Sequence, residues 1–185
     1  MSVTVKKPDD DFEQLQPGTY QAVCKGVFDI GQQRQEYNGD VKYVDQVIIV
    51  FEVDERMTIE KYAGERFNMS AWFTASLHEK ANLRKTLENW RGRQFTEKEL
   101  EGFDLEVLIG VTCLLSVTKS NSGKSIIGSI SPPMKGSQKL QIEKPFKETP
   151  EWIQKLTKKP ETSQENVSQD PYNPNITDDD DKIPF

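Results

Sequence analysis

The 185-residue sequence has few of the residues on which metal sites, disulfide frameworks and most hydrolytic enzymes depend. Its two cysteines, Cys24 and Cys113, lack CxxC spacing and lie in apolar stretches, so we expect buried, reduced thiols. His78 is the only histidine, and it belongs to no HExxH motif. No Gly-x-Ser-x-Gly motif or catalytically spaced cluster of acids and histidine occurs. The sequence therefore predicts no metal, no cofactor and no enzyme activity.

Long hydrophobic runs are also missing. No stretch of about 18 apolar residues is present, and residues 1–7 lack the apolar core of a signal peptide. We therefore expect no membrane span and a cytoplasmic location. Gly123-Lys124-Ser125 resembles the end of a phosphate-binding P-loop, but Thr118 stands where that motif needs its first glycine. Because a strand rather than a helix is expected after it, we exclude a P-loop.

Charge is distributed unevenly along the chain. The net charge is −6, and residues 161–185 alone contain seven acidic residues and one lysine. Residues 119–159, by contrast, contain nine lysines and three glutamates. Because the charges are segregated rather than mixed, the acidic total does not argue against a nucleic-acid partner.

The first part of the chain shows the alternation of β-strands. After a polar, acidic segment, residues 1–16, that we expect to be a mobile arm, strands are predicted at 19–30 and 41–54. A polar loop, 31–40, should connect them and turn at its Asn-Gly pair. Lys25, Lys42, Gln46 and Glu52 fall on the polar positions of these strands, so we expect them on a solvent-exposed face.

The third predicted strand, residues 66–73, places apolar side chains on one face and Arg66 and Trp72 on the other. An arginine in line with a tryptophan on a polar face suits a platform on which bases stack. A second small core, or a helix packed over that face, would explain Trp72 equally well.

A helical period follows. Ser76 and Glu79 have the spacing of a capping box, apolar residues then recur up to Trp90, and Gly92 should end the helix. We expect Trp90 to be structural. Thr96 and Glu99, spaced as a second capping box, should begin a shorter helix. Two further strands are predicted at 111–119 and 124–131, whereas periodicity does not assign residues 105–109.

The rest of the chain divides into two segments. Residues 132–159 form a basic extension in which Thr149-Pro150-Glu151 predicts the start of a short helix with Trp152 and Leu156. Residues 160–185 are expected to be disordered, because they are rich in polar and acidic residues and have little to bury.

The order of these elements indicates an all-β fold, a β-barrel with an inserted helix. Three strands, a helical segment and two strands match the five-stranded oligonucleotide/oligosaccharide-binding (OB) barrel, and we assign this domain to residues 17–131. An SH3-like or other small barrel fits the same order.

The last eight residues combine an acidic run with an apolar end. Phe185 would fit an apolar slot of a partner, its carboxylate would bind a basic side chain, and the aspartates would face a basic rim. The residues of this tip are Asp178, Asp179, Asp180, Asp181, Lys182, Ile183, Pro184 and Phe185. The tip resembles that of bacterial and phage single-stranded DNA-binding proteins, although Lys182 departs from the usual uninterrupted pattern. A solubilising tail with a chance apolar end is the alternative.

The resemblance implies a protein that coats and protects single-stranded DNA during replication, recombination or repair and recruits partner enzymes through its tip. In a phage-encoded protein the site of action would be the cytoplasm of the host bacterium. Lysines and arginines would neutralise phosphates while aromatic side chains stack on bases. The candidate DNA-binding residues are Trp72, Arg66, Arg34, Tyr37, Lys119, Lys124, Lys42 and Lys25. For Tyr37, anchoring of its loop is the alternative.

Other functions fit the same residues. A strand-annealing recombination protein would share the interface, and an adaptor on the same barrel would bind only protein. The sequence leaves open the oligomeric state, the number of nucleotides bound and the preference for DNA over RNA.

Overall fold

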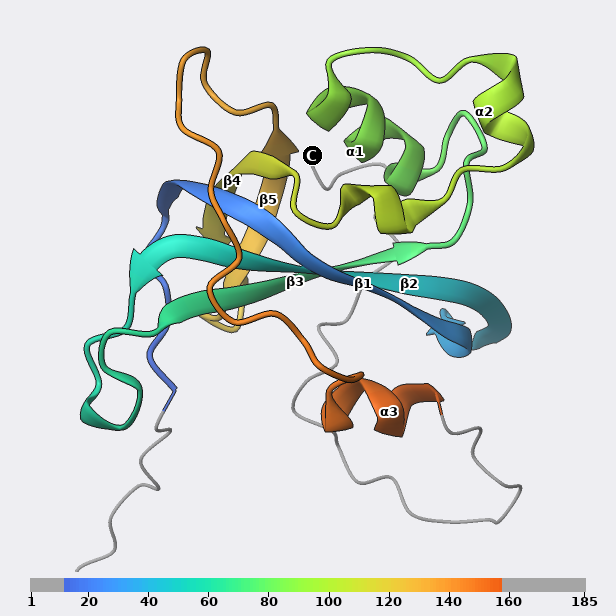
Figure 1. The fold of residues 1–185 in the computed structure, drawn as a ribbon. Coiled ribbons are helices and arrows are strands. Elements are labelled where there is room, and N and C mark those ends of the chain that lie inside the picture. Colours follow the sequence, from blue (N-terminus) through green and yellow to red (C-terminus); the bar gives the residue numbers. More distant parts are fainter. Residues whose placement is uncertain (1–11, 158–185) are drawn as a thin grey trace, which may run out of the picture.

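A computed structural model of the chain describes residues 12–157, whose arrangement is shown in Figure 1. These residues form strands β1 (Gly18–Tyr37), β2 (Asp40–Arg56), β3 (Arg66–Thr74), β4 (Thr112–Lys119) and β5 (Ser125–Ser131). The helices are α1 (Asn82–Arg91), α2 (Glu97–Glu101) and α3 (Glu151–Thr157), with 3₁₀ turns η1 (Glu60–Tyr62) and η2 (Leu105–Leu108). The predicted order of three strands, a helical segment and two strands is confirmed.

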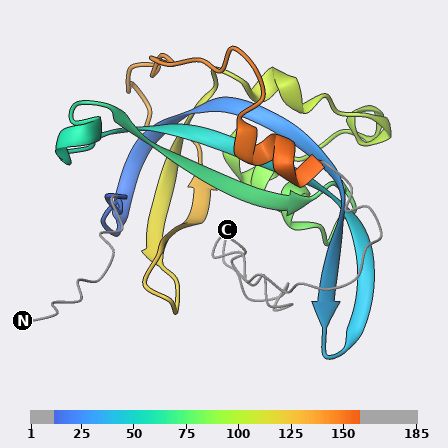
Figure 2. The same ribbon diagram turned by 90° about the horizontal axis from the view of Figure 1, so that it is seen from below.

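The strands form one antiparallel sheet in the order β3-β2-β1-β4-β5. Within the described residues the sheet is open, with β3 and β5 as its edges. It is strongly curved, and Figure 2 shows β1 and β2 as an arch. The curvature brings β3 and β5 close to each other although they are not hydrogen-bonded. The fold is therefore mostly β, with a helix between β3 and β4.

The inner face of the sheet and α1 enclose the main hydrophobic core. Alternate residues of the strands, such as Phe51, point inward because side chains alternate across a sheet. α1 contributes Leu83, Leu87 and Trp90, which the helical period places on one side. The indole N–H of Trp90 donates a hydrogen bond to the carbonyl of Thr112 at 3.1 Å. The predicted structural role of Trp90 agrees with this burial.

Both cysteines are free and buried in the main core, as predicted. Burial raises the pKa of the Cys24 thiol to about 12, and it raises the pKa of Cys113 as well. Both thiols therefore stay protonated near neutral pH and are poor nucleophiles. Among residues 12–157, no three His, Cys, Asp or Glu side chains are placed to hold a metal ion.

The first hairpin is longer than predicted. Residues 31–37, expected in a loop, continue β1 and pair with β2 up to Tyr37 opposite Asp40. Asn38 and Gly39 make the turn with φ of 49° and 86°, as the predicted Asn-Gly turn requires. The loop prediction was wrong because backbone pairing next to a tight turn needs no alternation of apolar and polar side chains.

The start of α1 also differs from its prediction. Ser76 and Glu79 do not cap this helix, which begins at Asn82. The Ser76 hydroxyl instead accepts a hydrogen bond from the backbone N–H of His78 at 3.2 Å, closing a local turn.

The later helix signals are confirmed. Thr96 and Glu99 form a reciprocal capping box at the start of α2. Gly92 ends α1 in the left-handed conformation, with φ of 70°. Residues 105–109, which periodicity did not assign, contain the turn η2.

The described end of the N-terminal segment, residues 12–16, contacts the sheet. Leu15 is buried in the main core. The Glu13 carboxylate accepts hydrogen bonds from the backbone N–H groups of Thr58 at 2.6 Å and Ile59 at 3.0 Å, and these bonds lower its pKa. The folded region therefore begins before residue 17, where sequence analysis placed its boundary.

Residues 132–150, here called the strap, cross the outer face of the sheet, which is the face opposite the main core (Figure 1). The strap leads into α3, which confirms the short helix predicted there. Ile153 is the fully buried residue of α3, whereas Trp152 is 44% exposed. Within residues 12–157, no helix has the length and hydrophobicity needed to cross a bilayer.

Candidate nucleic-acid interface

Trp72 lies on the outer face of the edge strand β3, in line with one residue of β2 and one of β1. It pairs with Ile48 of β2, which in turn pairs with Phe28 of β1. Trp72 is half-buried in a second hydrophobic cluster. The other members of this cluster are Phe28, Ile30, Ile48, Val50, Phe146, Ile153 and Leu156. Phe146 belongs to the strap, and Ile153 and Leu156 belong to α3. Trp72 therefore lies in a second small core between the sheet and these two segments.

Lys25 and Arg66 flank the carboxylate of Glu52, which is 2% exposed. Arg66 donates a hydrogen bond to this carboxylate at 3.2 Å, and the Lys25 ammonium lies 3.6 Å from it. Burial lowers the pKa of Lys25, while the charge of Glu52 opposes that shift. The prediction that Lys25, Gln46 and Glu52 face solvent is wrong, because all three are buried, Lys25 and Glu52 under the strap.

Glu52 also anchors the strap. Its carboxylate accepts hydrogen bonds from the backbone N–H groups of Glu143 at 2.8 Å and Lys144 at 3.3 Å. The Glu143 side chain pairs with Arg56 at 2.6 Å and with Arg66 at 3.3 Å. A phosphate could reach Lys25 or Arg66 only by displacing these partners.

Arg34, Tyr37 and Lys42 lie in a two-stranded extension of the sheet. We call residues 31–45 the ribbon, because there β1 and β2 pair only with each other. Arg34 is opposite Tyr43, so these two side chains share one face. Lys42 is opposite Gln35, which lies two positions before Tyr37, so Lys42 and Tyr37 share the other face. Each face of the ribbon therefore carries one aromatic and one basic side chain.

The ribbon is exposed on both faces. Tyr43 is 64% and Tyr37 47% exposed, and Arg34 pairs with Glu36 at 2.7 Å. Tyr43 was missed in the sequence analysis because its odd position groups it with the inward-facing residues of β2. The ribbon contains three acidic and two basic residues, so its contribution to binding would be aromatic rather than electrostatic.

Lys119 and Lys124 lie at the other hairpin, where they flank the tip between β4 and β5. Both are exposed, and the Lys119 ammonium donates a hydrogen bond to the Ser125 hydroxyl at 3.1 Å. Figure 2 shows that this hairpin and the ribbon project on the same side of the sheet. The structure thus places the eight candidates in three groups: the ribbon, the outer face and the β4–β5 tip.

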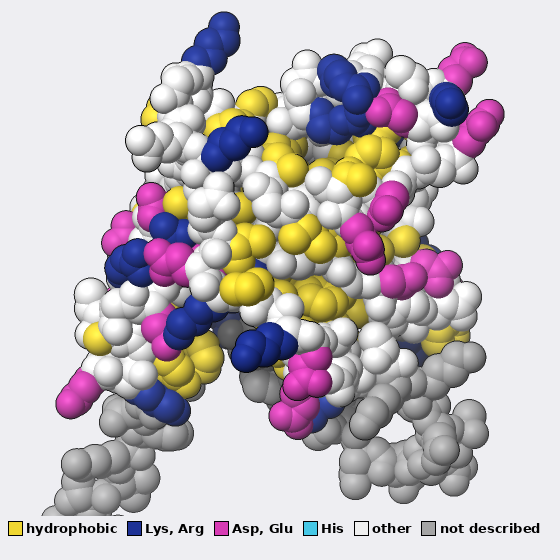
Figure 3. Space-filling model, viewed as in Figure 1, with side chains coloured by type: hydrophobic (Ala, Val, Ile, Leu, Met, Phe, Trp, Pro, Cys, Tyr) yellow, Lys and Arg dark blue, Asp and Glu magenta, His cyan; other side chains and the backbone are white. Residues whose placement is uncertain are grey.

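The strap adds basic side chains that sequence analysis did not select. Lys135, Lys139 and Lys147 are exposed, whereas Lys144 pairs with Glu65 at 2.6 Å. Figure 3 shows Lys and Arg side chains spread over the part of the surface that the strap crosses. The excess of lysine in residues 119–159 could have identified these side chains as candidates. They were not selected because the segment was not expected to pack on the domain.

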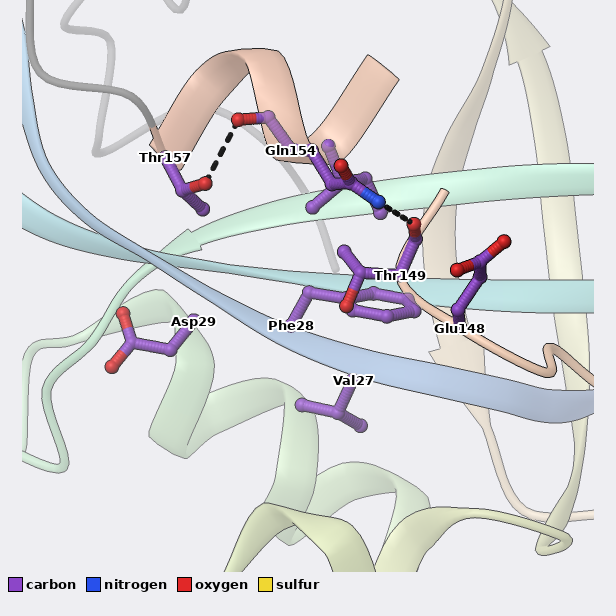
Figure 4. Close-up of a pocket in the computed structure, with 8 residues that line it drawn as sticks. Val27, Phe28, Asp29, Glu148, Thr149, Gln154 and Thr157 are labelled. Atoms are coloured by element: carbon purple, nitrogen blue, oxygen red, sulfur yellow. Dashed lines mark hydrogen bonds between the residues drawn. The ribbon is translucent and has the colours of Figure 1, made fainter. Parts of the chain in front are cut away.

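α3 does not seal the outer face. A pocket of about 530 Å³ opens between β1 and α3 and is lined by Val27, Phe28, Asp29, Glu148, Thr149, Ile153, Gln154 and Thr157. In Figure 4 the ring of Phe28 lies beside Thr149, whose carbonyl accepts a hydrogen bond from Gln154 at 2.6 Å. The helix therefore covers Phe28 only in part.

The tip residues Asp178 to Phe185 and the segment before them lie outside the described residues. Comparison of the chain with protein-family models and with curated proteins gave no match.

Proposed function

We propose that this protein binds single-stranded DNA through an OB-type barrel and performs no chemistry on it. The strand order is the observation that carries the proposal. An OB barrel is a partly open, five-stranded Greek-key barrel. Here β1 pairs with both β2 and β4, the sheet is open between β3 and β5, and α1 is inserted between β3 and β4.

The positions of the candidate residues support the same function. OB barrels bind oligonucleotides on the face of strands 2 and 3 and on the loops that join strands 1–2 and 4–5. Arg34, Tyr37 and Lys42 lie on the ribbon, which joins strands 1 and 2 in place of the first of these loops, and Lys119 and Lys124 flank the second. Trp72 and Arg66 lie on the outer face of β3, and Lys25 lies near Arg66 on β1, although the strap must move before DNA could reach Arg66 or Lys25.

Binding would combine two physical contributions. Exposed lysines of the β4–β5 tip and the strap would neutralise phosphates and release counterions, which makes affinity depend on salt. Aromatic side chains would stack on bases, at about 1–3 kcal/mol for each base by truncation. Both contributions tolerate any sequence, as a protein that coats DNA requires.

The acidic tip would recruit replication, recombination and repair enzymes to the coated strand. The ring and carboxylate of Phe185 would anchor the contact, and the four aspartates would speed the encounter. Deleting residues 178–185 should abolish capture of such enzymes and leave oligonucleotide affinity unchanged or higher. Retention of the same enzymes by the truncated protein would show that the tail only solubilises the protein.

A mobility-shift titration with a labelled thymidine oligonucleotide, challenged with duplex DNA and with RNA, tests the proposal. We expect preferential binding of the DNA single strand and a steep loss of affinity between 50 and 200 mM salt. Equal affinity for duplex, or no binding at low salt, would overturn the proposal.

One observation favours an adaptor that binds only protein. Val107, Ile109 and Val111, within and just after η2, are apolar side chains more than 40% exposed and belong to none of the three candidate groups. Absence of oligonucleotide binding in the same titration would favour this function. A strand-annealing activity would instead appear as faster pairing of complementary strands when the protein is added.

A further inference from the structure

The strap and α3 are held on the outer face by different kinds of contact. The strap is bound through the Glu52 and Glu143 carboxylates, and Phe146 packs directly over Gly26, where a Cβ would lie 3.0 Å from its ring. Lys25 lies over the same ring at 4.6 Å from its centre. These contacts tie the strap to the sheet up to Phe146.

α3 has much weaker attachments. It buries Ile153 fully and Leu156 in part, and within residues 12–157 one hydrogen bond joins it to the sheet, from the Gln33 amide to the Leu156 carbonyl at 3.1 Å. The helix has seven residues, well below the length at which a helix is stable alone. The pocket beside Phe28 leaves part of the underlying surface uncovered. We therefore expect α3 to detach before the strap does.

The surface beneath α3 has the composition of a base-stacking platform. Phe28, Ile48 and Trp72 form a row across β1, β2 and β3, so two aromatic rings flank an aliphatic side chain. The face of the ribbon that carries Tyr37 and Lys42 is continuous with the outer face of the sheet. A strand of DNA that follows the outer face from the ribbon would cross the position of α3.

We propose that α3 is a displaceable cover and that single-stranded DNA competes with it for the row of Phe28, Ile48 and Trp72. Residues 147–150 form the hinge, because they join the anchored Phe146 to the helix. This inference rests on the proposed DNA binding. It implies that the measured affinity equals the affinity of the uncovered surface multiplied by the fraction of molecules in which α3 is detached.

Two variants of α3 test the competition in the full-length protein. Ile153→Ala removes the buried contact of the cover, while Trp152→Ala truncates a larger, 44% exposed side chain of the same helix. With a thymidine oligonucleotide, fluorescence anisotropy should show about five- to tenfold tighter binding by Ile153→Ala, because the detached fraction rises. Trp152→Ala should bind like the wild type. Unchanged or weaker binding by folded Ile153→Ala would overturn the inference.

A double variant identifies the surface that is uncovered. Adding Trp72→Ala to Ile153→Ala should remove the gain in affinity, because the exposed row loses its larger ring. A gain that persists in the double variant would show that DNA does not use this row. Thermal unfolding of each variant verifies that the main core is intact.

Hydrogen exchange on the wild type gives a test that needs no variant. Saturating oligonucleotide should lower the protection of the amides in residues 151–157 and leave residues 138–146 protected. Bound DNA with α3 equally or more protected would overturn the inference and leave the proposed function standing. Failure of both the wild type and Ile153→Ala to bind oligonucleotide would overturn the proposed function itself.

Discussion

The middle of strand β2, residues 46–53, is buried on both faces, but the two faces are covered by different parts of the chain. On the inner face Val47, Ile49, Phe51 and Val53, and on the outer face Gln46, Ile48, Val50 and Glu52, are no more than 5% exposed. α1 and the curved sheet enclose the inner face, whereas the strap and α3 cover the outer one. The two faces of β2 are therefore buried to the same extent in different ways: the inner face by the main core, and the outer face by one segment later in the sequence.

The two faces also differ in chemistry. The inner face is apolar throughout, so it stabilises the fold through the hydrophobic effect in proportion to buried area. The outer face combines an apolar row with the buried Glu52, whose partners must all be in place because an unpaired buried charge is costly. The inner face thus stabilises the fold through buried apolar area, whereas the outer face depends also on specific partners of a buried charge.

Truncation of the inner core should have the largest effect on stability. Trp90→Ala removes a buried ring from α1 and the hydrogen bond that the Thr112 carbonyl accepts, so we expect a loss of about 3–5 kcal/mol in the free energy of unfolding. Urea denaturation followed by circular dichroism measures it. Trp152→Ala is the matched control and should cost less than about 0.5 kcal/mol. Similar losses in both variants would contradict the assignment of Trp90 to the core.

A smaller but still large effect is expected from the outer face. Glu52→Gln leaves Lys25 and Arg66 without their buried counter-charge and weakens the anchor of the strap, which should cost about 3 kcal/mol. Glu143→Gln should cost much less, because this side chain is 41% exposed and exposed ion pairs contribute little to stability. Urea denaturation of both variants compares them. A loss for Glu143→Gln as large as that for Glu52→Gln would show that the exposed pairs, rather than the buried carboxylate, hold the strap.

The inner face could be predicted from the sequence because its signals are local. Alternation in β2 and β3 and the spacing of Leu83, Leu87 and Trp90 each point to one buried side. The outer face could not be predicted, because its cover comes from far along the chain: Glu143, which donates its N–H to Glu52, is 91 positions away. A glutamate at a polar position of a strand is expected in solvent unless that distant partner is known.

For the candidate interface, too, the sequence predicted the face on which a residue lies but not what covers that face. Alternation placed Trp72 on the outer face correctly, but it could not show that Phe146 and Ile153 pack against it. Tyr43 was not selected as a candidate because the period of β2 continues unchanged into the ribbon, where the core has already ended. Periodicity thus reports which side of a strand a residue occupies and not whether anything lies on that side.

The turn end of the ribbon, residues 36–43, is exposed on both faces, and it gives the smallest expected effect on stability. Tyr37 is 47% exposed there and contacts no core, so Tyr37→Ala should change the free energy of unfolding by less than about 0.5 kcal/mol. If the ring stacks on a base, the same variant should lower affinity for a thymidine oligonucleotide by about fivefold or more, since stacking is worth about 1–3 kcal/mol. Tyr37→Phe keeps the ring and should bind as the wild type does. Anisotropy titration and urea denaturation of both variants separate the two roles: a loss of stability with unchanged affinity would mean that Tyr37 anchors the hairpin and does not stack.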